Sequence, residues 1–248
     1  MTTVSSHVGT RQGGHDRFFL YMSGALLACV LIGFSRTLYL RAYFDVPAIP
    51  THVYVHGAVL TAWYVWFCVQ ASLIAVRRLD VHRRLGFIGV GLGVSVVATG
   101  LTAALRLAPR LRAKYGDIES DLDRLSGIVW GNFAMLFAFT IFLGSAVLWR
   151  RRPDIHKRLM LLASISIAAP ALGRIARFPT FDGIPDGAIA FGGLLALLIA
   201  VLLHDVVCEK RVHRVTLVGA PFLLVCLVLG GLVIANTDFA RTFVDSLP

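Results

Sequence analysis

Six of the eight histidines lie inside or directly beside long apolar stretches, where a titratable side chain is costly and often functional. His52 and His56 are four residues apart, so a helix would place both on one face, within reach of one metal ion. The other four lie in or near short basic segments and are His82, His156, His204 and His213. Because imidazole is a common ligand of haem iron and copper, these six residues are the candidate haem or metal ligands.

A second group of side chains could line a binding pocket. Steps of seven residues from His56 reach Trp63 and Gln70, which together form a polar and aromatic stripe along one helix. Lipid cannot satisfy the hydrogen bonds of such a stripe, so we expect it to face the interior of a helical bundle. Asn132 and Arg36 are predicted at a similar outer depth on other helices. These five residues are the candidate pocket.

Each feature also has a structural interpretation. Histidine and tryptophan commonly occupy the membrane interface, and Gln70 could simply bridge two helices. Two histidines do not complete a structural zinc site. Asp80 and Asp154 stand two residues before His82 and His156, where they would cap the amino ends of helices. The histidine turns could therefore serve only to start helices and to contact lipid phosphates.

The composition places all of these residues in a membrane protein. The chain has 248 residues, of which 57% are apolar and 15% charged, and its mean hydropathy is +0.75. A soluble domain carries about 25% charge. The net charge of +10 does not indicate nucleic-acid binding, because the cations lie in the gaps between apolar segments.

We predict an all-α integral membrane bundle of about seven transmembrane helices, arranged as repeated hairpins. A span needs about 20 apolar residues. The candidate spans are residues 18–40, 52–76, 85–107, 127–149, 159–175, 188–207 and 215–235. The fifth is the shortest and contains Pro170, which would kink or interrupt its helix.

Basic turns follow the second, fourth and sixth spans, at residues 77–85, 150–159 and 210–214. By the positive-inside rule these turns are cytoplasmic, and so is the N-terminus. We therefore expect a flexible cytoplasmic tail at residues 1–17, a transmembrane domain at 18–235 and a short outward-facing tail at 236–248. The expected location is the bacterial inner membrane. The expected partner is the lipid bilayer, and a larger membrane complex is a further candidate partner.

Well-known catalytic patterns are missing from the sequence. It contains no phosphate-binding Gly-Lys-Ser/Thr loop, no Gly-x-Ser-x-Gly elbow, no Cys-x-x-Cys pair and no His-Glu-x-x-His helix. No catalytic residue can be named, and the sequence leaves open whether the protein is an enzyme.

The second to fifth spans, about half of the chain, resemble a group of uncharacterised bacterial polytopic membrane proteins. The resemblance is carried by His52, His56-Gly57, Trp63, Gln70, His82-Arg83-Arg84-Leu85-Gly86 and His156-Lys157-Arg158-Leu159-Met160. The turns are also similar, more distantly, to those of multi-histidine membrane proteins associated with cytochrome oxidase assembly. The closer resemblance implies no activity, whereas the distant one implies handling of haem or copper.

We therefore predict a redox-linked or assembly protein whose histidines bind haem or a metal. A carrier or sensor of a small molecule or lipid, using the candidate pocket, is the alternative. A structural subunit of a membrane complex is a third possibility.

Overall fold

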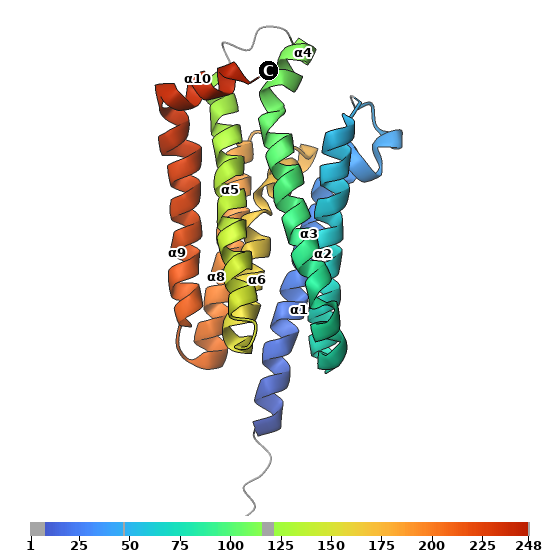
Figure 1. Cartoon of the computed structure of the whole chain (residues 1–248), viewed down its shortest axis with the longest axis vertical. Helices are drawn as coiled ribbons and strands as arrows, with labels where there is room; N and C mark the ends of the chain where they lie inside the picture. The colour runs from blue at the N-terminus through green and yellow to red at the C-terminus, as the bar shows by residue number, and fades with distance from the viewer. Residues whose placement is uncertain (1–7, 47, 116–121, 248) are drawn as a thin grey trace, which may run out of the picture. The chain divides into compact units, whose positions relative to one another are not determined.

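The computed structural model describes residues 8–46, 48–115 and 122–247, and within these ranges every regular element is helical (Figure 1). The long helices are α1 (Val8–Gly33), α2 (Thr51–Ala75), α3 (Leu79–Leu105), α5 (Leu122–Leu148), α8 (Asp186–Glu209) and α9 (Arg214–Val228). The shorter ones are α4 (Leu107–Tyr115), α6 (Pro153–Ser166), α7 (Ala169–Ile175) and α10 (Asp238–Ser246). Single turns of π- or 3₁₀-helix complete the chain at η1 (Ser35–Tyr39), η2 (Arg41–Tyr43), η4 (Pro179–Phe181), η5 (Leu229–Val233) and η6 (Ile234–Asn236).

Six helical segments of the described chain are long and apolar enough to cross a membrane, and the pair α6 and α7 makes a seventh if it counts as one span. The predicted all-α membrane bundle is thereby confirmed. The fifth span is interrupted between Ser166 and Ala169, directly before Pro170 in the first turn of α7. Proline lacks a backbone donor and clashes with the preceding helical turn, so the interruption falls where the sequence predicts it.

Helical structure extends into both segments that were expected to be tails. α1 already begins at Val8, and α10 occupies most of the C-terminal segment. The start of α10 is capped by Thr237, whose Oγ1 accepts a hydrogen bond from the Ala240 N–H at 3.2 Å. Arg112 of α4 binds α10 at its other end, with an ion pair of 2.6 Å to Asp245.

The aspartates of the basic turns do not act as helix caps. α6 is preceded by Arg152, which makes no side-chain capping bond, and Asp154 lies inside the first turn. Asp80 likewise lies inside the first turn of α3. The prediction of aspartate caps is therefore wrong, because each helix starts two residues earlier than a cap at its aspartate requires. At these positions the carboxylates still interact favourably with the positive amino end of the helix.

The chain forms two compact units, and the division falls inside α2 and α3. The first unit comprises Met1–Asp45, Thr61–Leu92 and Ala168–His213. Here α7 packs against both α1 and α8, and Gly33 brings α1 so close to Ala171 that a Cβ atom would contact its backbone. Arg174 of α7 lies over the ring of Phe34, 4.2 Å from its centroid.

The second unit comprises Val46–Leu60, Gly93–Ile167 and Arg214–Pro248. Its centre is α5, which packs against α6, α9, η5, η6 and α10, and Figure 1 shows α10 across the end of α5. Glycines allow this packing: a Cβ on Gly230 would stand 2.5 Å from the Cβ of Ala134 on α5. Ser126 fixes the same contact by donating a hydrogen bond of 2.7 Å to the Ala235 carbonyl.

Candidate binding site

The five residues of the candidate pocket are divided between the two units. His56 and Asn132 belong to the second unit, and Arg36, Trp63 and Gln70 to the first. Arg36 is exposed in η1, with its guanidinium 4.9 Å from the ring centroid of Phe44. Trp63 is fully buried, and Asn132 is partly buried on α5. The five-residue pocket stays a prediction, but its member Gln70 has an unusual environment.

Gln70 has a primary amide buried inside a membrane span. Its Oε1 and Nε2 atoms are both inaccessible to solvent, and neither has a hydrogen-bond partner in the structure. Burying a polar group without a partner costs about 1–3 kcal/mol. Such groups are rare in folded proteins, so each needs a physical explanation, for example an ordered water, an ion or a ligand.

Trp66 extends this polar site, and it was missed in the sequence. Its Nε1 donor is also buried without a hydrogen-bond partner. Trp66 and Gln70 are four residues apart on α2 and therefore share one helix face. The indole lies against α3, because a Cβ on Gly89 would stand 3.3 Å from Nε1. The sequence pattern was built from positions seven residues apart, starting at His56, and this spacing does not include Trp66. The four-residue spacing of neighbouring positions on a helix face links Trp66 to Gln70.

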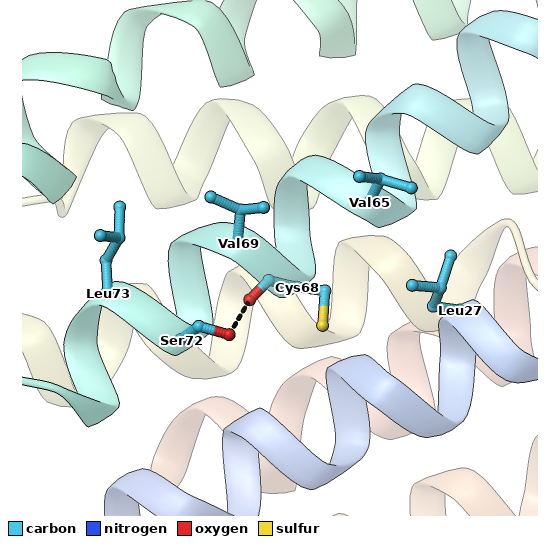
Figure 2. Close-up of a pocket in the computed structure, with 6 residues that line it drawn as sticks. All are labelled: Leu27, Val65, Cys68, Val69, Ser72 and Leu73. Carbon is cyan, nitrogen blue, oxygen red and sulfur yellow. Dashed lines mark hydrogen bonds between the residues drawn. The ribbon is translucent and has the colours of Figure 1, made fainter.

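An apolar groove of about 360 Å³ lies between α1 and α2 (Figure 2). One wall is Leu27 of α1 and the other is formed by α2, with Val65, Cys68, Val69, Ser72 and Leu73. Val69 lies three residues after Trp66, and Leu73 lies three residues after Gln70. Residues at this spacing are neighbours on the surface of a helix. Figure 2 shows the Cys68 side chain on the side of α2 that faces Leu27.

The Ser72 hydroxyl is not available as a second polar group in the groove. It donates a hydrogen bond of 2.8 Å to the Cys68 carbonyl of its own helix, which Figure 2 marks. Serine commonly bonds back to the preceding turn in this way. Near the groove, the buried side-chain atoms without a hydrogen-bond partner are therefore Nε1 of Trp66 and Nε2 and Oε1 of Gln70.

His56 joins two helices of the second unit. Its Nδ1 atom is 3.1 Å from Oγ1 of Thr99 on α3, and Thr99 in turn donates to the Ser95 carbonyl. His52, one turn earlier, has a buried Nε2 without a hydrogen-bond partner. Arg106 and Arg110 lie near enough for their charges to act on the His52 ring.

His156 holds α6 against the end of α5. Its Nδ1 lies 2.8 Å from the carbonyl of Ala146. A carbonyl only accepts, so Nδ1 carries the proton and donates to one of the last carbonyls of α5. His82 lies in the first turn of α3.

His204 is buried near the end of α8, within the first unit. It stacks on Phe18 with a centroid distance of 4.0 Å, and Phe19 meets its ring edge-on at 5.6 Å. The neighbouring Asp205 is fully buried and accepts a hydrogen bond of 3.2 Å from the His213 N–H. Nδ1 of His204 lies 3.7 Å from Oδ1 of Asp205.

Comparison of the chain with protein-family models, with curated proteins and with solved structures gave no match in any of the three. The function of the site therefore has to be argued from its own geometry.

The described residues contain no group of three or more His, Cys, Asp or Glu side chains positioned to hold a metal ion. Among the candidate ligands, His56 contacts Thr99 through its side chain, and His156 contacts Ala146. Binding of haem or copper by any of the six histidines stays a prediction.

Proposed function

We propose that this protein binds a small lipid-soluble molecule within its membrane helices and acts as a carrier or sensor of it. The observation that carries the proposal is the pair Trp66 and Gln70, whose three polar side-chain atoms are buried in a span without partners. Hydrocarbon offers these atoms no hydrogen bond, and the protein supplies none. A bound molecule would satisfy them and recover part of the cost of their burial.

The adjacent groove supports the same proposal. Ligand sites typically combine a mostly apolar surface with a few well-placed polar groups. Here the apolar surface lies between α1 and α2, and the polar groups lie on the neighbouring face of α2. This combination favours a molecule with a long apolar part and a small polar head.

Alkylation of Cys68 tests the proposal, because this thiol lines the groove. A variant with Cys29→Ser, Cys208→Ser and Cys226→Ser keeps Cys68 as the single cysteine. Its reaction with N-ethylmaleimide in lipid nanodiscs is followed with and without three ten-carbon probes, 1-decanol, 2-decanone and decane. We expect at least one probe to slow the reaction several-fold, because an occupied groove excludes the reagent.

Two controls separate site binding from a general effect on the membrane. Adding Gln70→Leu to the same background keeps a side chain of similar size and removes the amide, and protection should be lost. A second background keeps Cys226 alone, which lies on α9 in the other unit, and it should show no protection. Equal protection of Cys68 with and without the Gln70 amide contradicts the proposal.

We also propose that the protein lies in a bacterial inner membrane with its N-terminus in the cytoplasm. The support is the distribution of arginine and lysine, which concentrates in the turns after the second, fourth and sixth spans. The turn between α2 and α3 and the turn between α8 and α9 would then be cytoplasmic.

A further inference from the structure

The donors and acceptors of the polar face restrict the chemistry of the molecule that it can bind. The Trp66 indole N–H only donates, whereas the Gln70 amide donates through Nε2 and accepts through Oε1. A head group with acceptors alone, such as a ketone, ester or quinone, would leave Oε1 unpaired. A head group that both donates and accepts would satisfy all three atoms.

The location of the polar face favours an uncharged head group. Gln70 lies five residues before the end of α2, which corresponds to about 7.5 Å along the helix axis at about 1.5 Å per residue. Trp66 lies one turn deeper. α2 contains no Asp, Glu, Lys or Arg between Thr51 and Ala75, so it offers no counter-ion. A charge without a counter-ion is costly at this depth.

We propose that the molecule bound at Trp66 and Gln70 is a neutral amphiphile with a hydroxyl or primary-amide head group on an apolar chain. A long-chain alcohol or a neutral lipid with a free hydroxyl belongs to this class. The inference rests on the binding function proposed above and defines its ligand. In the complex, the ligand oxygen accepts from Trp66 Nε1 and Gln70 Nε2, and the ligand O–H or N–H donates to Gln70 Oε1.

The groove accommodates the apolar chain of such a molecule. Val69 and Leu73 separate the groove from the polar face, and both line the groove. Gln70 itself is partly exposed, although its amide atoms are covered. In the proposed complex, the side chains of Gln70 and Trp66 both rotate, so that their polar atoms reach the head group at the edge of the groove.

The three ten-carbon probes distinguish this inference from the general function. They have similar apolar chains but differ in their head groups: 1-decanol donates and accepts, 2-decanone only accepts, and decane does neither. We measure the concentration of each probe that halves the rate of Cys68 alkylation. A hydrogen bond contributes about 1 kcal/mol net, so 1-decanol should bind about fivefold more tightly than 2-decanone, with decane weaker again.

Two variants assign the difference to the polar face. Gln70→Leu should make 1-decanol and 2-decanone bind alike, because the remaining Trp66 N–H only donates and both probes can accept from it. Trp66→Phe keeps an aromatic ring and removes the N–H, so it should weaken 1-decanol by about fivefold and leave decane unchanged. Comparable near- and far-ultraviolet circular dichroism of the purified variants and the parent establishes that both fold.

The outcomes separate the two proposals. If 2-decanone protects as well as 1-decanol, the proposed head group is wrong while the binding function stands. If decane protects Cys68 as well as 1-decanol does, and this protection still depends on Gln70, the proposed head group is likewise wrong while the binding function stands. If no probe protects Cys68 more in the parent than in the Gln70→Leu variant, the binding function itself fails, and ordered water inside the protein accounts for the buried polar atoms.

Discussion

Two cations of the basic turns adopt a backbone conformation that is unfavourable for them. Arg77 has a φ angle of 61° and Lys210 of 59°, both in the left-handed region. Lys210 directly follows the end of α8, and Arg77 follows α2 by two residues. Glycine is the usual residue in this conformation, because it has no Cβ atom. A cation is nevertheless favourable at the carboxyl end of a helix and on the cytoplasmic face.

Replacing Arg77 by glycine should stabilise the isolated protein. The Arg77→Gly variant relieves the left-handed strain, and we expect the free energy of unfolding to rise by about 0.5–1 kcal/mol. The measurement is reversible unfolding in mixed micelles. Arg78→Gly is the matched control: it removes the same charge at a residue without a positive φ angle and should lower the stability. A loss of stability in Arg77→Gly equal to that in the control would contradict the explanation.

At the scale of the helices, contacts between backbones decide the packing in both units. Gly33 places α1 against α7, and Gly230 places η5 against α5. Helices in a membrane associate through close packing, since lipid tails are as apolar as the side chains that they replace. Two glycines of α3 differ in their surroundings: Gly89 lies against Trp66, whereas Gly86 has open space around it. Of these two, Gly89 alone serves packing.

Replacing glycine by alanine should affect the stability differently at two positions of α1, Gly33 and Gly24. Gly33→Ala would drive a Cβ into the backbone of Ala171, and we expect a loss of about 1–3 kcal/mol in the free energy of unfolding. Gly24→Ala meets nothing within 4 Å and should leave stability unchanged or raise it by up to about 1 kcal/mol. Thermal unfolding of the two variants in the same detergent tests this difference. Equal effects at both positions would mean that α1 does not approach α7 as closely as the structure indicates.

At the scale of the whole molecule, the number of spans depends on the interrupted helix. α6 and α7 reach the length and apolar character of a span only together. If they cross the membrane as one span, the chain has seven spans and its two ends lie on opposite sides. If they do not cross, the chain has six spans and both ends lie on the same side.

Reporter fusions decide between these topologies. With seven spans and a cytoplasmic N-terminus, we expect alkaline phosphatase fused after Gly183 or at the C-terminus to be active. Green fluorescent protein fused at the same positions should stay dark, because it does not fold when exported. Fusions after Arg151 should give the opposite result, since that turn follows the fourth span. Bright fluorescence from the C-terminal fusion would leave α6 and α7 as a re-entrant segment.

The sequence by itself determines the helical class, the membrane location and the positions of the spans. These properties depend on local composition: an uninterrupted apolar run is enough to define a span, and Pro170 is enough to interrupt one. The spacing of Gln70 along α2 also places it correctly among the residues whose polarity needs an explanation.

Only the tertiary structure decides which polar atoms have partners, because those partners lie on other helices. His56 bonds to Thr99 and His156 bonds to Ala146, although both histidines looked equally available for a metal in the sequence. The sequence did not indicate a role for Trp66, because the contact of its indole with Gly89 of α3 is seen only in the tertiary structure. The sequence predicted a site along His56, Trp63 and Gln70, which are seven residues apart. In the structure the candidate site is the pair Trp66 and Gln70, four residues apart, whose buried polar atoms have no hydrogen-bond partner.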